Sequence, residues 1–385
     1  MAKRQAANSS ISSRIWIILG LMSMGIIKAV LADPPVASHA DSFSKEGLFK
    51  ADASKLKDTQ LVPDPDVPLQ ENQNVLWCGT FQLVWNKAIA LVGEKLHFLN
   101  QPPLVNLLNR QDFTDADLDP ASYIARADFE RNNVEDKIRA ALEETFHGAA
   151  SPELIPPKPA NPGPDDFVAY AYLYKNLSFT HPFQDNDPLT FAAQPVQNFG
   201  YVKNRDQVSS DVSNQVLVYD YQSPDNFIVQ LKTKSTGDEL ILAKFPPGAT
   251  LEATMNDVLQ RMAAHKPEVA RKQDPLAVPK LNFDLRKSFR ELEGLVLQPG
   301  PAARIKGRLV IGEAQQLVRF QLNEKGAILK SEAVIVMRAL AMPSAPARPM
   351  IFDQPFLILM KQANSDHPYF ALWVGNASLL VPADK

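Results

Sequence analysis

The pattern of apolar positions divides the chain into a helical front and a remainder rich in strands. Apolar residues recur at helical spacing in a segment that follows Asn74, and again from about Ala125 to Phe146, where Gly148 predicts the end. Short apolar or alternating runs then predict strands at Phe167–Tyr174, Gln215–Tyr221, Phe227–Thr233, Glu239–Phe245, Arg308–Ile311, Leu317–Leu322, Ala333–Arg338, Phe356–Lys361 and Tyr369–Val374. Two more helices are predicted among them, one with Thr250 as N-cap and one at about Leu285–Leu292. Helices first and strands afterwards indicate an α+β fold with large mixed β-sheets.

Two segments show neither the helical nor the strand spacing of apolar residues. Residues 33–72 mix Pro, Asp, Ser and Lys, which predicts a flexible leader with at most a short helix around Phe43–Leu56. Residues 151–166 contain six prolines and can be neither helix nor central strand. We interpret them as a stiff connector, and as the best candidate for an internal boundary, within a folded region that spans residues 73–385.

Residues 1–32 predict a secretory signal peptide. A basic front with Lys3, Arg4 and Arg14 borders the 13-residue apolar run Ile15–Ile27, which is short for a membrane span. Small residues at Val30 and Ala32 suit cleavage before Asp33, and an uncleaved anchor is the alternative. We expect a mature chain that is secreted, either extracellular or periplasmic, and has no stable association with the membrane.

Composition narrows the chemistry further. Without the four cations of residues 1–32, the chain keeps 36 basic and 43 acidic side chains, so no nucleic-acid partner is predicted. Cys78 is the only cysteine, which excludes an intrachain disulfide. The six histidines have no metal-ligand spacing, and Asp115, Asp117 and Asp119 precede Pro120 where a calcium loop needs glycine. We therefore predict no metal and no cofactor, and assign those aspartates to helix capping and surface charge.

Near the C-terminus, the apolar run Met350–Met360 is interrupted by one polar step. This interruption is marked by Phe352, Asp353, Pro355 and Phe356. Pro355 must lie at a bend or a sheet edge because it lacks a backbone N–H donor. This segment resembles the C-terminal signature of the serpin family.

Further segments resemble serpin landmarks in the same order. They are Ala171–Lys175 followed by Phe179–Phe183, Leu240–Pro246 before the Thr250 helix, Val278–Phe283, Phe320–Gly326 and Leu372–Asn376. The resemblance covers the C-terminal two thirds. The N-terminal third departs from it, because it is shorter and places the proline-rich connector where a helix covering the main sheet is expected.

The resemblance implies a serpin-like fold with an exposed reactive loop and no catalytic residues of its own. It predicts an inhibitor of serine-type endopeptidases, a monomer whose partner is a serine protease and which is not an enzyme. Such an inhibitor acts as a suicide substrate, because the protease cleaves the loop and the cut loop then inserts into a β-sheet. The alternatives are a non-inhibitory serpin-fold binding protein and a secreted enzyme.

Insertion requires small residues at alternate, inward positions of the loop, and two registers are possible. In one, Gly326 is the hinge and bulky residues follow it. In the other, which we prefer, Lys330, Ser331, Glu332 and Ala333 form the hinge, with Ser331 and Ala333 inward. Lys330 replaces the family's glycine, bulky residues follow Ala333, and Ala333–Arg338 could instead be a strand already in place. The preferred register puts the scissile bond after Ser344, and the other puts it after Leu340. Arg338 and Met342 are further candidates.

Overall fold

Eight strands form the largest sheet of the computed structural model, which describes residues 47–148, 150, 152–202, 209–305, 307–325 and 346–383. The order is β13-β10-β11-β12-β18-β19-β3-β2. The strands are β2 (Thr59–Val62), β3 (Asn74–Cys78), β10 (Val216–Ser223), β11 (Asn226–Leu231), β12 (Asp238–Lys244), β13 (Glu268–Val269), β18 (Phe356–Gln362) and β19 (Pro368–Val374). Neighbours are antiparallel except β2 and β3. Every residue of β3 and β19 is buried, which explains the uninterrupted apolar sequences of β19 and of β3 after Asn74.

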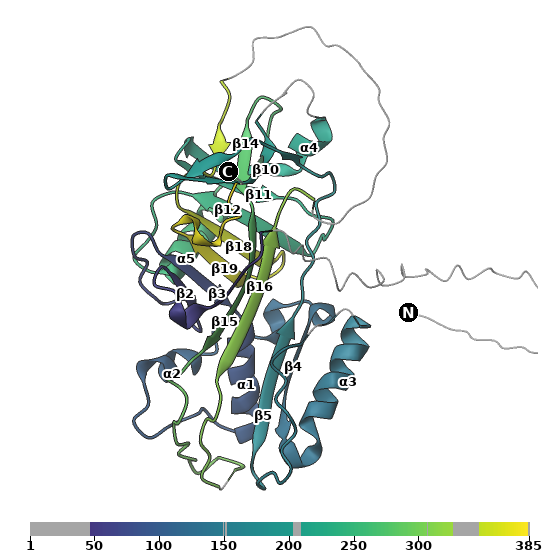
Figure 1. Cartoon of the computed structure of the whole chain (residues 1–385), viewed down its shortest axis with the longest axis vertical. Coiled ribbons are helices and arrows are strands. Elements are labelled where there is room, and N and C mark those ends of the chain that lie inside the picture. The colour runs from purple at the N-terminus through teal and green to yellow at the C-terminus, as the bar shows by residue number, and fades with distance from the viewer. Residues whose placement is uncertain are drawn as a thin grey trace, which may run out of the picture. The chain divides into compact units, whose positions relative to one another are not determined.

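Two smaller sheets lie against this one. The first has the order β1-β15-β16, with β1 (Phe49–Asp52), β15 (Leu281–Ser288) and β16 (Gln315–Leu322). The second pairs β4 (Tyr123–Phe129) with β5 (Phe167–Leu173). In Figure 1, β15 and β16 stand beside β4 and β5. Alternate residues of β16 are buried, so one face of that strand packs on the core.

The remaining strands form a four-stranded sheet and a hairpin. The sheet has the order β17-β14-β9-β6, with β6 (Gln184–Asp185), β9 (Asn198–Tyr201), β14 (Leu276–Pro279) and β17 (Met350–Ile351). The hairpin pairs β7 (Leu189–Phe191) with β8 (Gln194–Val196).

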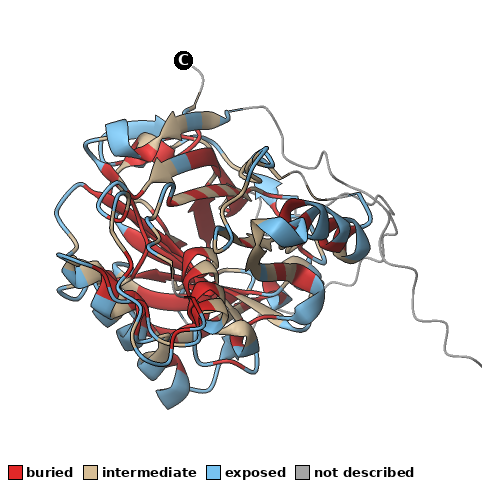
Figure 2. Ribbon diagram, turned by 90° about the horizontal axis from the view of Figure 1, so that it is seen from below, coloured by how far each residue is buried: buried red, intermediate tan, exposed pale blue. Residues whose placement is uncertain are grey.

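Five helices accompany the sheets within the described ranges. They are α1 (Thr80–Val92), α2 (Pro103–Leu108), α3 (Val134–Phe146), α4 (Ser210–Asn214) and α5 (Leu251–Ala264). Helix α1 packs against β4 and β5, and α3 packs mainly against β4. Figure 2 shows buried residues along the inner strands and inward helix faces, and exposed residues outside them. Among the described residues, no helix is long and apolar enough to cross a membrane.

Most of the predicted strands are confirmed to within a few residues, as is the predicted N-cap. Strands β5, β10, β11, β12, β16, β18 and β19 lie where the apolar pattern placed them. The hydroxyl of Thr250 accepts a hydrogen bond from the Ala253 amide, 3.1 Å away, at the start of α5. The α+β class predicted from the order of elements is confirmed.

Three predictions of regular elements were wrong in part. Residues 125–129 belong to β4, because Tyr123–Phe129 pairs residue by residue with β5 and Asn133, with a φ of 55°, separates that strand from α3. Residues 285–288 continue β15 along β16, and turns rather than a helix follow. Arg308–Ile311 forms no strand, and only Val310 makes an isolated bridge, to Val296.

The predicted leader and the helix after Asn74 also differ from the structure. From residue 47 onward the leader is folded, because β1 pairs with β15, and β2 pairs with β3. A strand and a 3-10 turn (Ala53–Lys55) replace the short helix considered there. Asn74–Cys78 is strand β3, and the helix begins at Thr80. The described residues form one compact unit that includes the proline-rich connector.

Asn74 joins the two ends of this fold through a fully buried side chain. Its Oδ1 accepts hydrogen bonds from the amides of Gly375 (2.9 Å) and Asn376 (3.1 Å). Its Nδ2 donates to Thr59 Oγ1, Asn376 Oδ1 and Ser378 Oγ, at 3.1, 2.8 and 2.9 Å. Removing this amide leaves several buried polar groups without partners.

We expect Asn74→Ala to lower the free energy of unfolding by about 2–4 kcal/mol, because an unsatisfied buried donor or acceptor costs about 1–3 kcal/mol. Urea unfolding followed by circular dichroism measures the change. The exposed residue Asn106 supplies the control, since Asn106→Ala should change the value by less than about 0.5 kcal/mol. Equal effects of the two substitutions would contradict this interpretation of Asn74.

Candidate functional site: a slot between β5 and β16

A cavity of about 180 Å³ separates strands β5 and β16. Tyr170–Lys175 line one side and Leu317–Phe320 the other, while Cys78, Thr80, Met360, Tyr369 and Phe370 also line it. The two strands belong to different sheets, and no strand of the described residues lies between them. We call this cavity the slot. The aromatic rings of Phe320 and Phe370 stack within it, with their centroids 4.6 Å apart.

The two strands that border the slot run in the same direction. At their beginnings, the Gly307 amide, which precedes β16, donates to the carboxylate of Asp165, which precedes β5, at 3.0 Å. Beyond their C-terminal ends, the Phe183 amide donates to the carbonyl of Glu324 at 2.9 Å. A strand placed between them could therefore be antiparallel to both, which gives the better hydrogen-bond geometry.

A buried ion pair fixes the C-terminal end of β5. Lys175 Nζ lies 2.8 Å from Asp238 Oδ1, and each side chain is 8% exposed. The Tyr369 hydroxyl donates to the same oxygen at 3.1 Å. Burial, and then the charge of Asp238, raise the pKa of Tyr369, so its phenol stays protonated. These contacts join β5 to β12 and β19 of the large sheet.

Another ion pair holds the chain just after β16. Lys280 Nζ lies 2.6 Å from Glu324 Oε2 and 2.5 Å from Asp185 Oδ1. Burial opposes ionisation of both Lys280 and Glu324, but their mutual attraction prevails. The pKa of Lys280 is raised and the pKa of Glu324 is lowered. The described chain stops at Lys325, directly after this pair, and residues 326–345 lie outside the described residues.

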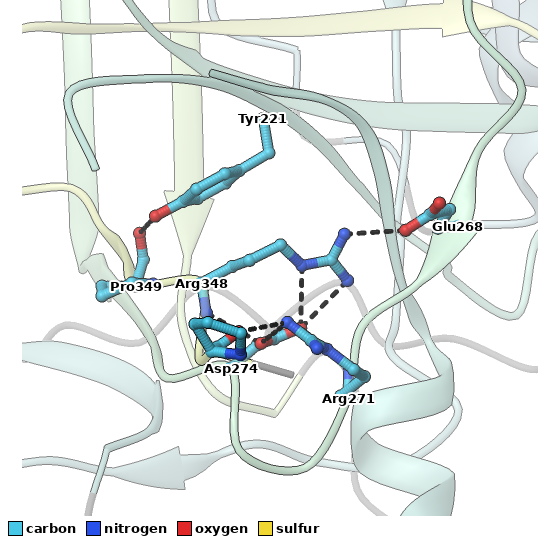
Figure 3. A network of polar contacts seen from close by, with 7 residues as sticks. Tyr221, Glu268, Arg271, Asp274, Arg348 and Pro349 are labelled. Carbon is cyan, nitrogen blue, oxygen red and sulfur yellow. Dashed lines mark hydrogen bonds and ion pairs between the residues drawn. The ribbon is translucent and has the colours of Figure 1, made fainter. Parts of the chain in front are cut away.

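A second polar network holds the chain where it returns at residue 346, as Figure 3 shows. The Arg348 amide donates to Asp274 Oδ1 at 2.8 Å, and its guanidinium donates to Asp274 Oδ2 at 3.0 Å. Arg271 donates to Asp274 Oδ1 and to the Pro346 carbonyl, at 2.9 and 2.7 Å. Glu268 accepts from Arg348 at 2.9 Å, and the Tyr221 hydroxyl donates to the Pro349 carbonyl at 3.2 Å. We call these contacts the Asp274 anchor.

The predicted signature residues build the turn that links β17 to β18. Phe352 and Phe356 are fully buried, with ring centroids 5.0 Å apart. Asp353 Oδ1 lies 2.5 Å from Nζ of Lys244, whose side chain is 3% exposed and also donates to the Ile351 carbonyl. Pro355 occupies the exposed bend before β18, as its missing donor requires. These residues are structural, and they lie outside the slot.

The predicted hinge and cleavage positions fall outside the described residues. These are Gly326, Lys330, Ser331, Glu332, Ala333, Arg338, Leu340, Met342 and Ser344, together with the predicted strand Ala333–Arg338. The described chain ends at Lys325, just past β16, and resumes at Pro346, just before β17.

Two other groups of acidic residues in the described ranges were candidates for a site. Asp117 accepts hydrogen bonds from both Ser365 (2.8 Å) and His367 (3.1 Å), whereas a catalytic triad places the histidine between the serine and the carboxylate. Thr114 and Asp117 form a capping box and Asp119 caps the next turn, which confirms the capping interpretation for these two aspartates, whereas Asp115 forms an ion pair with Lys87. Within the described ranges, no three acidic, histidine or cysteine side chains could hold a metal ion.

The sequence matches no known protein-family model and no curated protein. Function therefore has to be argued from the slot and from the two ends of residues 326–345. Sequence reasoning missed the contacts of Asp274 with Arg348, of Lys175 with Asp238 and of Glu153 with Arg319, because these partners are distant in sequence. Lys244 gave a weak signal, since a cation at the end of an apolar strand is often buried with an acidic partner.

The Asp274 anchor predicts a characteristic dependence of stability on pH. We expect Asp274→Asn to lower the free energy of unfolding by about 2–4 kcal/mol near pH 7, because two arginines lose a buried anionic partner. Burial alone would raise the pKa of Asp274, but hydrogen bonds from Arg271 and Arg348 keep it below the usual value. The stabilisation is therefore present above the unfolded-state pKa of about 3.9 and is lost as pH falls through the folded pKa.

Urea unfolding of both proteins at several pH values measures this dependence. The difference between wild type and Asp274→Asn should be constant above about pH 5 and shrink below about pH 4. The exposed residue Asp366 provides the control, because Asp366→Asn should have little effect at any pH. A difference that is the same at acid and neutral pH would show that the carboxylate charge is not what stabilises the anchor.

Proposed function

We propose that this chain is a serpin-like inhibitor of serine-type endopeptidases that acts as a suicide substrate after export. The protease serine would attack a bond within residues 326–345 and form an acyl-enzyme. The N-terminal part of the cut segment would then enter the slot as a new strand and carry the attached protease with it. The slot between β5 and β16 is the observation that carries this proposal.

The geometry around the slot supports the proposal in two respects. Strands β5 and β16 border the slot from opposite sides and belong to different sheets, so a strand that paired with both would join the two sheets into one. The segment that would supply this strand begins beyond Glu324, at the end of β16. It would turn back and run antiparallel to both β16 and β5.

The positions of the family-like landmarks also support it. Ala171–Lys175 ends β5 and lines the slot, and Phe320–Gly326 begins at the end of β16. Leu240–Pro246 is the end of β12 before α5, while Val278–Phe283 joins β14 to β15. Of these family-like segments, Ala171–Lys175 and Phe320 line the slot from opposite sides, which supports the proposal.

The other residues that line the slot explain why an inserted strand needs small residues at alternate positions. Tyr369 and Phe370 of β19 and Met360 of β18 are buried and bulky. Each overpacked inward position would cost about 1–3 kcal/mol. In the preferred register Ser331 and Ala333 face inward and Glu332 faces outward, so the first inserted residues fit this requirement.

Incubation with elastase, chymotrypsin and trypsin, followed by denaturing gels, tests the proposed function. We expect a covalent band at the summed mass of inhibitor and protease with one of them. Sequencing the released C-terminal fragment then distinguishes Arg338, Leu340, Met342 and Ser344 as the cleaved position. Clean cleavage without that band would instead support the non-inhibitory alternative.

A matched pair of hinge variants tests insertion itself. Ala333→Arg places a charged side chain at an inward position and should convert the inhibitor into a substrate that is cleaved without forming the covalent band. Glu332→Arg places the same side chain at the neighbouring outward position and should keep inhibition. Cleaved wild type should also gain about 5 °C or more in its unfolding midpoint, and cleaved Ala333→Arg should gain less. Identical behaviour of the two variants would contradict the proposed register.

A further inference from the structure

Glu153, in the proline-rich connector, contacts the β16 side of the slot. Its Oε1 lies 2.8 Å from Nη2 of Arg319 on β16. Its Oε2 lies 3.4 Å from Nη2 of Arg286 on β15 and 3.9 Å from Nζ of Lys50 on β1. One carboxylate therefore meets cations from all three strands of this sheet. We call these contacts the Glu153 bridge.

A buried acid beneath Glu153 holds its partners in place. Asp284 Oδ2 lies 2.7 Å from Nη2 of Arg319 and 3.3 Å from Nζ of Lys50, and the Asp284 side chain is 2% exposed. Among these described residues, Lys50, Arg286 and Arg319 carry three positive charges and Asp284 carries one negative charge, so the carboxylate of Glu153 lies beside a net positive charge that attracts it.

The residues that follow Glu153 are held on the opposite side of the slot. Leu154 and Ile155 pack against the apolar cluster formed by α3, β4 and β5, which contains Ile138 and Tyr170. Glu153 and Leu154 both line the slot. Two consecutive residues thus attach to different sides, one by charge and the other by apolar packing.

A second contact joins the two sides at the other end of the connector. Asp165 accepts a hydrogen bond from the Gly307 amide at 3.0 Å and lies 3.8 Å from Arg131. That contact involves the chain just before β5 and β16, whereas the Glu153 bridge contacts Arg319, in the middle of β16. The connector therefore spans the slot between two attachment points.

We propose that the Glu153 bridge restrains the slot and so regulates insertion, an inference that rests on the proposed function of the slot. While the bridge is formed, Glu153 and Leu154 hold the β4–β5 sheet at a fixed distance from β16. A strand can enter only when the two sheets are free to adjust and the connector moves aside. The Glu153 side chain is 32% exposed, so salt screens its attraction to the cations and the restraint is reversible.

Hydrogen exchange of the intact protein tests the bridge without requiring insertion. In Glu153→Gln, which keeps the shape and removes the charge, we expect amides of residues 170–173 and 317–320 to exchange about two- to tenfold faster than in wild type. Raising NaCl from about 50 to about 500 mM should accelerate the wild type and leave the variant nearly unchanged. A folding defect would instead accelerate exchange throughout the protein and would not depend on salt.

Two further variants set the scale of the effect. Glu144→Gln removes an exposed charge of α3 that has no ion pair among the described residues, and it should behave as wild type. Arg286→Gln removes only the 3.4 Å contact and should have a smaller effect than Glu153→Gln. If Glu153→Gln exchanges at the wild-type rate with the same salt dependence, the bridge does not restrain the slot.

The consequence for insertion is measured with a fluorescent synthetic peptide of residues 330–343 added to the intact protein. The peptide should associate about two- to tenfold faster with Glu153→Gln than with wild type. If it enters neither protein, the proposed function of the slot is contradicted, and the exchange rates still decide whether the bridge exists. If it enters both at one rate, the bridge is not regulatory and the proposed function stands.

Discussion

The architecture depends on two strands, β5 and β16, that border the slot, run in the same direction and do not pair with each other. Strands β5 and β16 border a cavity lined also by aromatic and sulfur-containing side chains of the large sheet. Strand edges normally gain free energy by pairing, so a space of this kind has to be maintained by its surroundings. Here three contacts fix the strand ends: Lys175 with Asp238, Glu324 with Phe183, and Asp165 with Gly307.

The ion pairs at either end of residues 326–345 give this segment two different attachments. Glu324, paired with Lys280, lies two residues after the end of β16, which borders the slot. Arg348, paired with the fully buried Asp274, precedes β17, which belongs to a different sheet. Under the proposed mechanism, the N-terminal part of the segment is therefore the part that joins the β5–β16 gap. After cleavage the C-terminal part stays on β14 through the Asp274 anchor.

The elements that could be predicted from sequence are those whose own residues reflect their surroundings. Residues 356–360 of β18 and all of β19 are buried on both faces, and their unbroken apolar sequences indicate this. Thr250 caps α5 with its own hydroxyl. By contrast, residues 125–129 form a strand only because β5 pairs with them, and β1 joins the fold only through a parallel ladder with β15.

The charged contacts of the slot escaped prediction for a related reason. Glu153 and Arg319 are 166 positions apart, and Asp274 and Arg348 are 74 apart. A single sequence contains no signal for such pairings, because nothing in the local pattern of either residue depends on the other. For the same reason, the sequence did not indicate that the connector contacts both sides of the slot.

The central claim is that the space between β5 and β16 accepts a strand from residues 326–345. A crystal structure of the protein after cleavage in this segment tests it most directly. The account predicts continuous density for a new strand between β5 and β16, antiparallel to both, with Ser331 and Ala333 facing the large sheet. A cleaved protein with β5 and β16 still separated by an empty slot, and the cut ends elsewhere, would contradict it.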